Sequence, residues 1–426
     1  MWILVLSSGL AFYLAWNLGA NDVANSMGTS VGSKAITLRQ ALIIAGILEF
    51  VGAVLFGRGV SQKLATGVVN PSLFLDRPDW LLWGMVAVLL STSLWLNLAT
   101  YLGLPVSSSH ATVGAIAGMG WIAWGFSAVN WPSIGTISLS WIATPVLSGC
   151  LAALLYNLLR FGIFNRPNPE QHLQEWIPWL AVLLTGTFGV IVLPTVVTSI
   201  VTPALTLLSL GISLPPHTIS LGIGSLAAII ITFTIGGLTN ASTNLGLLRF
   251  QLETVFARFQ LLSACCVAFA HGSNDVGNAI APFAAILAID KTHQVPLMDL
   301  AIPLWVLAWG GLGIVVGLAL WGYKVIATIG EGIIPLQPSG GFCAELATAM
   351  TILLASRLGL PVSTSHALVG AVVGIGCVQN WRSIQLSTLR SIGLSWVATI
   401  PIAVLLGAGT FYVIRIFLPI AGNGMS

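Results

Sequence analysis

Long runs of apolar residues fill most of the chain, and only brief polar segments separate them. A helix that crosses a bilayer needs about 20 such residues, because the hydrocarbon core is about 30 Å thick. The pattern predicts an all-α polytopic integral membrane protein with about ten to twelve spans, some of them broken or re-entrant half-helices. The longest runs cover residues 2–16, 40–56, 80–100, 141–159, 176–201, 220–236, 256–270, 301–322 and 392–418, and shorter or glycine-broken runs cover 112–128, 278–289, 342–356 and 368–378.

Composition supports the same fold class. Charged residues make up 6% of the chain and apolar residues 56%, whereas charged residues are about 25% of an ordinary soluble protein. We therefore expect the chain to lie in a lipid bilayer, most simply the cell membrane. The net charge of +3 is too small to predict nucleic-acid binding. The first run has no basic start and continues into a polar motif, so we interpret it as a span and not as a cleaved signal peptide.

Two polar motifs each occur twice inside these apolar runs. The first reads Gly-Ala-Asn-Asp-Val-Ala-Asn at 19–25 and Gly-Ser-Asn-Asp-Val-Gly-Asn at 272–278. The second reads Leu-Pro-Val-Ser-Ser-Ser-His at 104–110 and Leu-Pro-Val-Ser-Thr-Ser-His at 360–366. Their offsets are 275 − 22 = 253 and 366 − 110 = 256 residues. Two motifs with nearly the same offset indicate that a half-protein was duplicated, as in many secondary transporters.

The duplication divides the chain into three parts. Residues 1–160 and 256–426 are the two predicted repeats, and residues 161–255 hold intervening spans and a short connector. Segments rich in basic residues are predicted to be cytoplasmic, and these are the segments with Arg160 and Arg166 and with Arg249 and Arg258. The segments 126–140 and 202–214 contain no Lys or Arg and are predicted to be external. The repeats are inverted if an odd number of crossings separates equivalent spans. The sequence leaves that parity open.

Each copy of the first motif places one acid between two amides in apolar surroundings, where polar groups are costly unless they bind something. We expect the nearby glycines to let the helix unwind, so that backbone carbonyls join the side-chain oxygens in a cage suited to Na⁺. The alternative is that these polar residues only tie helices together through hydrogen bonds. The candidates for the coupling ion are Asn21, Asp22, Asn274 and Asp275, with Asp22 and Asp275 as the Na⁺ ligands.

The second motif suits the opposite charge. Proline stops the preceding helix and the hydroxyl residues suit an N-cap, so each copy predicts the start of a half-helix, whose free amides attract anions. The alternative is an ordinary capped helix end without a ligand. The candidates for binding a tetrahedral oxyanion are Asn25, Ser107, Ser108, Ser109, Asn278, Ser363, Thr364 and Ser365.

Two further acids, Glu49 and Glu345, lie in apolar context. They do not occupy equivalent positions in the two repeats, and Glu49 aligns with Ile314. Each is a candidate for a second cation site, a proton carrier or a buried acid that only accepts hydrogen bonds.

At these residues the chain resembles the inorganic phosphate transporter (PiT) family. The hallmark motifs of that family match Gly19 to Asn25 with the segment 28–34, and His271 to Asn278 with the residues that follow. The resemblance implies symport of phosphate with Na⁺ or H⁺ through an inverted-repeat helical fold that often forms a homodimer. It also implies that Asp22, Asp275, Glu49 and Glu345 are the important acids. Small residues depart from the family pattern at Ser26, Ser273, Gly277 and Ala281.

We therefore predict a secondary symporter of inorganic phosphate with no cofactor other than its coupling ion, Na⁺ or H⁺. One alternative is a sulfate or other oxyanion permease of the same fold. An alternative of another class is an anion channel, against which the buried acids argue. An intramembrane enzyme is disfavoured, because the chain has no His-Glu-x-x-His motif and no separated Ser, His and Asp set.

Overall fold

The computed structural model describes residues 2–198, 215–237, 245–297, 300–330 and 333–417. Within these ranges the chain is almost entirely helical, and the one β contact is an isolated bridge between Val69 and Val129. The predicted all-α class is confirmed. The segment 202–214, predicted to be external, lies outside the described residues.

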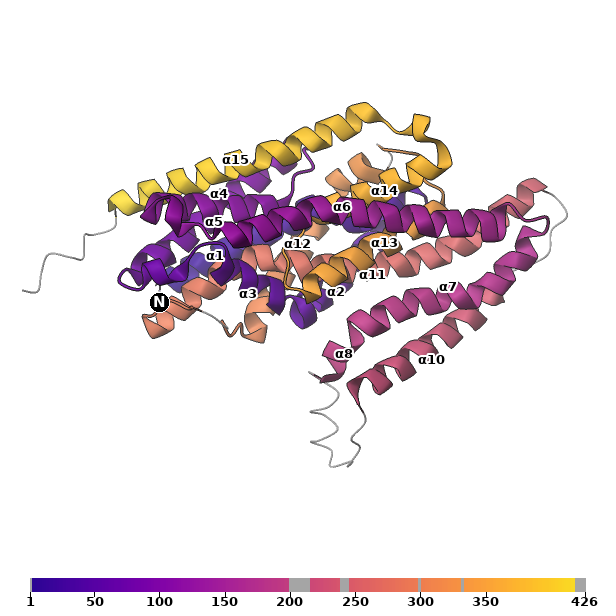
Figure 1. Cartoon of the computed structure of the whole chain (residues 1–426), viewed down its shortest axis with the longest axis horizontal. Helices are drawn as coiled ribbons and strands as arrows, with labels where there is room; N and C mark the ends of the chain where they lie inside the picture. The colour runs from indigo at the N-terminus through magenta and orange to yellow at the C-terminus, as the bar shows by residue number, and fades with distance from the viewer. Residues whose placement is uncertain (1, 199–214, 238–244, 298–299, 331–332, 418–426) are drawn as a thin grey trace, which may run out of the picture.

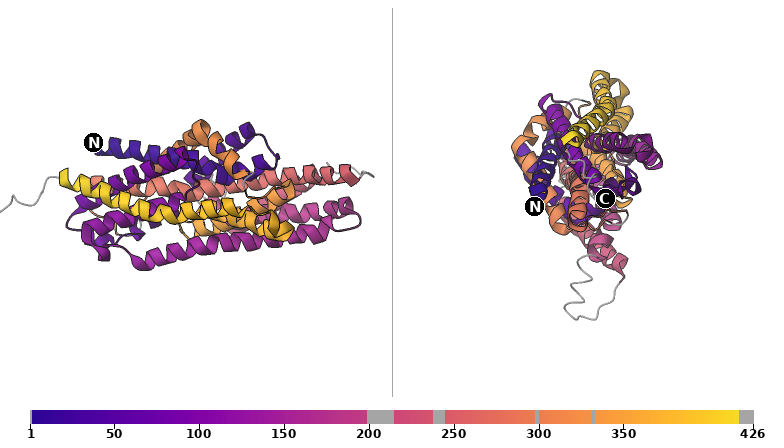
Figure 2. Two further views of the ribbon diagram at one scale, coloured as in Figure 1. Left: turned by 90° about the horizontal axis from the view of Figure 1, so that it is seen from above. Right: turned by 90° about the vertical axis from the view of Figure 1, so that its left-hand side faces the viewer.

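The helices form an elongated bundle, from which α7 and α10 project as a hairpin (Figure 1). The views in Figure 2 show that most helices run near the long axis of the bundle. In the first half the helices are α1 (Trp2–Gly32), α2 (Leu38–Phe56), α3 (Arg58–Gly67), η1 (Pro71–Phe74), α4 (Pro78–Tyr101), α5 (Ser108–Trp124), η2 (Phe126–Ala128), α6 (Trp131–Leu159) and η3 (Arg160–Phe164).

The second half repeats much of this order after the intervening hairpin. Its helices match the first half pairwise, α11 with α1, α12 with α2, α13 with α4, α14 with α5 and α15 with α6, because they carry the equivalent sequence motifs. The remaining described helices are α7 (Pro169–Ile191), α8 (Leu193–Val196), α10 (Pro216–Gly236), α11 (Leu245–Thr292), α12 (Leu304–Gly330), α13 (Pro338–Arg357), α14 (Thr364–Asn380), η5 (Trp381–Ser383) and α15 (Leu386–Phe417).

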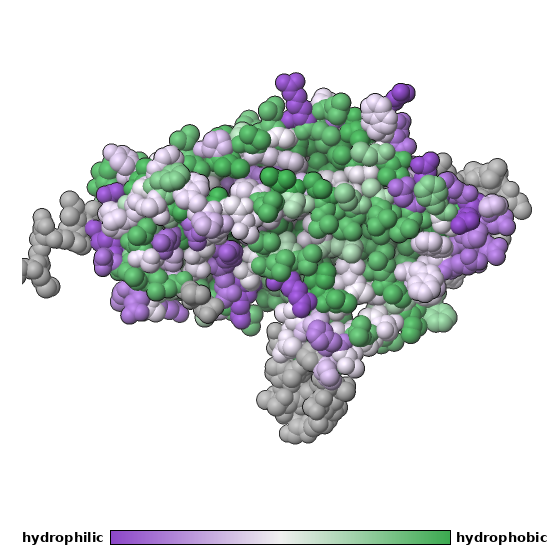
Figure 3. All heavy atoms as spheres, in the orientation of Figure 1, coloured by the Kyte–Doolittle hydropathy of each residue, from purple (hydrophilic) through white to green (hydrophobic). Residues whose placement is uncertain are grey.

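Nine of the described helices are long and apolar enough to cross a bilayer, namely α1, α2, α4, α6, α10, α11, α12, α13 and α15. The shorter helices α5 and α14, with 17 residues each, pack among them. Hydrophobic side chains cover most of the middle of the face in Figure 3, and hydrophilic ones gather toward the ends of the bundle. This distribution is that of an integral membrane protein, as predicted.

The two short helices begin in the same way. Gly103 and Gly359 both have φ +67°, a conformation open to glycine, and they reverse the chain after α4 and α13. Ser107 and Ser363 then cap α5 and α14 by accepting a hydrogen bond from the backbone N–H of the histidine three residues on. The predicted helix starts at the two Pro-Val-Ser motifs are therefore present.

The expected unwinding at the first motif is wrong. Helices α1 and α11 continue without a break through both copies, and α11 joins the two apolar runs at 256–270 and 278–289. The glycines serve close packing instead. A Cβ atom on Gly19 would lie 1.9 Å from the carbonyl oxygen of Ile314 in α12, and one on Gly272 would lie 2.0 Å from that of Glu49 in α2.

The two halves pack on each other reciprocally. α1 packs on α12 as α11 packs on α2, and α5 packs on α15 as α14 packs on α6. The contacts of Gly19 and Gly272 fall on Ile314 and Glu49, the two residues that the sequence aligns. Such reciprocal contacts are typical of two copies related by a twofold axis.

Candidate functional site

The predicted site residues of both motifs are all buried, and they meet where α1 and α11 contact the starts of α14 and α5. Asn25 on α1 donates from Nδ2 to Oγ1 of Thr364 at 3.4 Å. Reciprocally, Asn278 on α11 donates to Oγ of Ser108 and Ser109 at 3.4 and 3.3 Å. In each half, the first motif thus contacts the second motif of the other half.

The outer amides of the first motif hold the ends of the neighbouring helices. Asn21 Nδ2 donates to Oγ1 of Thr100 at 2.8 Å. Asn274 Nδ2 donates to Oγ of Ser356, the equivalent residue, at 3.0 Å and to the carbonyl oxygen of Leu360 at 3.1 Å. Asn21 and Asn274 are therefore tied into the scaffold, which is the alternative that the sequence left open for these amides.

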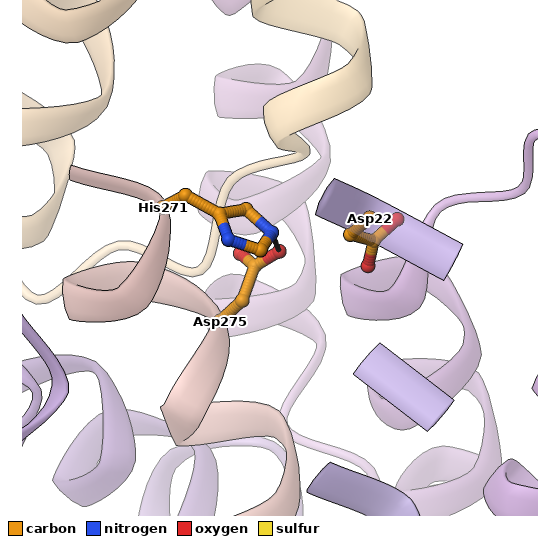
Figure 4. Close-up of side chains that lie close together, drawn as sticks. All are labelled: Asp22, His271 and Asp275. Atoms are coloured by element: carbon orange, nitrogen blue, oxygen red, sulfur yellow. Dashed lines mark ion pairs between the residues drawn. The ribbon is translucent and has the colours of Figure 1, made fainter. Parts of the chain in front are cut away.

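Two carboxylates from different halves lie close together at the centre of this region. Asp22, Asp275 and His271 each offer a ligand atom within 4.8 Å of the others (Figure 4). Nε2 of His271 lies 2.9 Å from Asp275 Oδ2, and its Nδ1 lies 3.1 Å from Glu49 Oε1. Three buried acids share one imidazole, so this cluster requires more positive charge than one histidine supplies when all three are ionised.

Several oxygens in the cluster have no hydrogen-bond partner among the described residues. They are Oδ2 of Asp22, Oδ1 of Asp275, Oδ1 of Asn278 and Oε2 of Glu49. A buried acceptor without a partner is costly. Carboxylate and amide oxygens are the ligands that hard cations prefer. The oxygens present therefore fit a hard cation such as Na⁺.

The hydroxyl residues of the second motif have different tasks. Ser107 and Ser363 are helix caps, and Ser365 contacts the Ser363 hydroxyl at 3.0 Å. Ser109 donates to the carbonyl oxygen of Val362 at 2.8 Å, which brings the starts of α5 and α14 together.

The middle hydroxyls, those of Ser108 and Thr364, contact the first motifs. Thr364 donates to Asp275 Oδ2 at 3.2 Å, and its counterpart Ser108 accepts from Asn278. The first amides of a helix have no partner inside it, so two helix starts side by side offer a cluster of donors for an anion.

The histidines after these hydroxyls contact the scaffold. Nδ1 of His366 lies 3.1 Å from the carbonyl oxygen of Trp141, and Nδ1 of His110 lies 3.5 Å from that of Trp396. Their rings meet with centroids 4.7 Å apart. This reciprocal packing fixes the two helix starts against each other.

Glu49 and Glu345 both contact the second half of α1, at different positions. Ser26 donates to Glu49 Oε1 at 2.8 Å. Glu345 accepts from Thr29 at 2.7 Å, Ser30 at 2.6 Å, Gln260 at 3.0 Å and Ser263 at 2.7 Å. Glu345 is thus saturated with donors, whereas Glu49 keeps one free oxygen and belongs to the central cluster.

The chain matches the phosphate transporter family over residues 18–407. The chain belongs to this family. The resemblance seen in the duplicated motifs is therefore confirmed, and the family is one of transporters and not of enzymes.

Relatives in this phosphate transporter family match along nearly the whole chain. A putative phosphate permease of Haemophilus influenzae is 41% identical over 97% of this chain and 97% of its own. A putative phosphate permease of Thermococcus kodakarensis is 39% identical over 97% of this chain and 98% of its own. The chloroplastic inorganic phosphate transporter 2-1 of Arabidopsis thaliana is 40% identical over 92% of this chain and 68% of its own.

A solved structure described as the sodium-dependent phosphate transporter superposes with a TM-score of 0.89 at 36% identity. It covers 98% of this chain and 100% of its own. A match of this extent shows that the phosphate transporter fold is shared along the whole length.

Several polar side chains that contact the predicted site residues do not stand out in the sequence. The repeat does not indicate a role for His271, because its counterpart at the 253-residue offset is Leu18. Thr100 and Ser356 both lie four residues before the Leu-Pro-Val-Ser motif and are related by its 256-residue offset. Extending the repeat alignment backward from that motif would have found them.

Proposed function

We propose that this member of the phosphate transporter family is a secondary symporter that moves inorganic phosphate together with Na⁺, by alternating access around the buried site. The observation that carries the proposal is the meeting of Asp22 and Asp275 with the paired starts of α5 and α14. Carboxylates suit a cation and helix starts suit an anion. The site thus has groups for both solutes.

The cation is assigned to Asp22 and Asp275, with the free oxygens of Asn278 and Glu49 nearby. Na⁺ is preferred to H⁺ as the coupling ion because several buried oxygens lack partners, and a bound cation would satisfy more than one of them. The structural relative described as sodium-dependent supports the same choice.

The phosphate is assigned to the amides at the starts of α5 and α14, with Ser108, Thr364, Asn25 and Asn278. Hydroxyl and amide donors bind a tetrahedral oxyanion without adding charge, so the anion can leave again. A carboxylate repels phosphate unless a cation lies between them. Coupling follows, because each solute lowers the electrostatic cost of the other.

Alternating access is supported by the direction of the helices. Phe12, Trp16 and Val23 on α1 meet Gly313, Gly317 and Gly322 on α12 in increasing order, so α1 and α12 run parallel. Since α1 and α2 are consecutive spans, α2 and its copy α12 run in opposite directions. This agrees with inverted repeats with boundaries near 1–160 and 256–426. The homodimer implied by the resemblance stays a prediction.

The test is uptake of radiolabelled phosphate into proteoliposomes, with Na⁺ and pH gradients imposed separately. The proposal expects uptake above equilibrium with an inward Na⁺ gradient and little with a choline gradient of the same size. Uptake driven only by the pH gradient would replace Na⁺ with H⁺. Flux independent of either gradient would favour a channel, and strong competition by unlabelled sulfate would favour a broader oxyanion permease.

A further inference from the structure

A cavity of about 500 Å³ lies beside the buried site, between the end of α2, the start of α3, α8, α12 and the end of α13. Its lining includes Phe56, Arg58, Thr195, Leu304, Ser356 and Arg357, which we call the arginine vestibule. Both arginines are exposed and stand at helix ends, Arg58 at the start of α3 and Arg357 in the last turn of α13, so their guanidinium groups are accessible to a solute in the cavity.

Both arginines keep their charge uncompensated among the described residues. Arg58 donates to the carbonyl oxygen of Ile302 at 3.4 Å. Arg357 donates to the carbonyl oxygens of Val190 and Ile191 at 3.0 and 3.2 Å. No described carboxylate pairs with either arginine, and none lines the cavity. The backbone contacts position the guanidinium groups and leave the cavity with two positive charges.

Ser356 connects the vestibule to the first motif of the second half. Ser356 lines the cavity, and its hydroxyl contacts Asn274 Nδ2 at 3.0 Å and Ser273 Oγ at 3.3 Å. Asn274 precedes Asp275 in the first motif. A solute in the vestibule is therefore next to the binding site and not at a remote surface.

The internal repeat shows that the fold does not require these arginines. The residue equivalent to Arg357 at the 256-residue offset is Tyr101, and the residue equivalent to Arg58 at the 265-residue offset of Glu49 and Ile314 is Tyr323. Ser356 corresponds to Thr100, which contacts Asn21 in the same way. The scaffold is thus repeated while the charge occurs on one side alone.

We propose that the arginine vestibule captures the phosphate oxyanion at one entrance to the site, before the anion passes Ser356. This rests on the proposed function and adds an entry step to it. A guanidinium group can donate two parallel hydrogen bonds to two oxygens of one phosphate. A positively charged cleft with apolar walls also raises the local concentration of anions.

The entrance has a predicted side. Arg160 contacts the carbonyl oxygen of Val378 at the end of α14, whereas Arg357 ends α13 at the opposite end of the α13–α14 pair. With the segment around Arg160 in the cytoplasm, as its charge predicts, the vestibule opens outward. Its charge then favours uptake from outside.

The experiment compares phosphate uptake by wild type, Arg58→Gln, Arg357→Gln and the double variant in proteoliposomes of zwitterionic lipid, with the protein in one known orientation. The double variant is expected to raise KM for phosphate about tenfold and leave the maximal rate within about twofold, since a steering charge acts on encounter. Added salt should raise the wild-type KM and change that of the double variant little. Arg39→Gln, at an equally exposed arginine that does not line the vestibule, is the matched control.

Phosphate transport from the opposite face, where the repeat has Tyr101 and Tyr323 in place of the two arginines, should keep its wild-type KM for phosphate in the double variant. An unchanged KM for uptake through the arginine side overturns the vestibule proposal alone. A wild-type protein that takes up no phosphate overturns the proposed function as well. If vesicles with anionic phospholipid raise the wild-type KM to that of the double variant and leave the KM of the double variant unchanged, a lipid phosphate group occupies the arginines and the capture of free phosphate is refuted.

Discussion

The two copies of the duplicated half share their scaffold and differ in their charge. Gly19 meets Ile314 where Gly272 meets Glu49, and the backbones approach equally closely. Yet the neighbours of these contacts are Leu18 in one half and His271 in the other. All four of these side chains, Leu18, Ile314, Glu49 and His271, are fully buried.

Glu345 shows the same contrast. Its counterpart at the 256-residue offset is Leu89, which is also fully buried. The hydroxyls of Thr29 and Ser30 that Glu345 accepts from correspond to Pro282 and Phe283 in the second half. The fold therefore forms with apolar residues at the equivalent positions of the other half, and this difference supports the proposal that the additional charges serve transport.

The largest effect is expected from the acids that both halves share. Asp22→Asn or Asp275→Asn should lower Na⁺-driven phosphate uptake at least about a hundredfold, because the variant loses the attraction between a proposed ligand carboxylate and the cation, about 4 kcal/mol at an effective dielectric constant of about 20. The measurement is uptake at equal protein density in the membrane. Asp76→Asn, at an exposed acid, is the control. Near-normal uptake in either site variant would contradict the shared role.

The next effect tests the asymmetry of Glu49 and His271 directly. Glu49→Ile and His271→Leu each recreate one residue of the first half, and each alone should lower the free energy of unfolding by roughly 3–5 kcal/mol, since it breaks a buried ion pair. The double variant should be more stable than His271→Leu, because it no longer leaves Glu49 without its partner and the equivalent Ile314 and Leu18 are both fully buried, but Asp275 still lacks its contact with His271. Thermal unfolding in detergent measures this.

Transport should fail in all three of these variants. A double variant less stable than both single variants would show that the charged pair supports the fold. A stable double variant with normal Na⁺-driven uptake would show that the charges are not needed for transport.

A smaller effect is expected for Glu345→Gln. The side-chain amide nitrogen of glutamine would replace one carboxylate oxygen that now accepts hydrogen bonds. A buried donor left without an acceptor lowers the free energy of unfolding by about 1–3 kcal/mol. The melting temperature should fall and uptake should decrease, while Leu89→Met in the equivalent position of the other half should change neither. A melting temperature equal to that of the wild type would mean that Glu345 is not held by its four donors.

The smallest effect is expected at the middle hydroxyls. Ser108→Ala or Thr364→Ala should raise KM for phosphate about fivefold, as one lost hydrogen bond is worth about 1 kcal/mol. The concentration of Na⁺ that gives half-maximal uptake should change less. Ser72→Ala at an exposed serine is the control. An equal loss of affinity for both solutes would contradict the division of roles between hydroxyls and carboxylates.

The sequence predicted the membrane fold and both helix starts, because each depends on local patterns. Ser107 and Ser363 are recognised as caps from the residues beside them. The unbroken course of α1 and α11 was not predicted. A glycine such as Gly19 permits either unwinding or close packing, and its partner Ile314 lies far away in the sequence.

The role of His271 was missed for the opposite reason. The duplication highlights residues that occur twice, and His271 occurs in one half alone. The four donors to Glu345 come from α1 and from the first half of α11, so no local motif reports them. Asymmetric features in a duplicated protein are found only when the two copies are superposed residue by residue.

The most direct measurement of the central claim is equilibrium binding of phosphate to the purified protein at increasing Na⁺ concentration. If both solutes meet at Asp22 and Asp275, Na⁺ lowers the Kd for phosphate, phosphate lowers the Kd for Na⁺ by the same factor, and Asp275→Asn abolishes both effects. A phosphate Kd that does not change with Na⁺ in the wild-type protein would contradict the account.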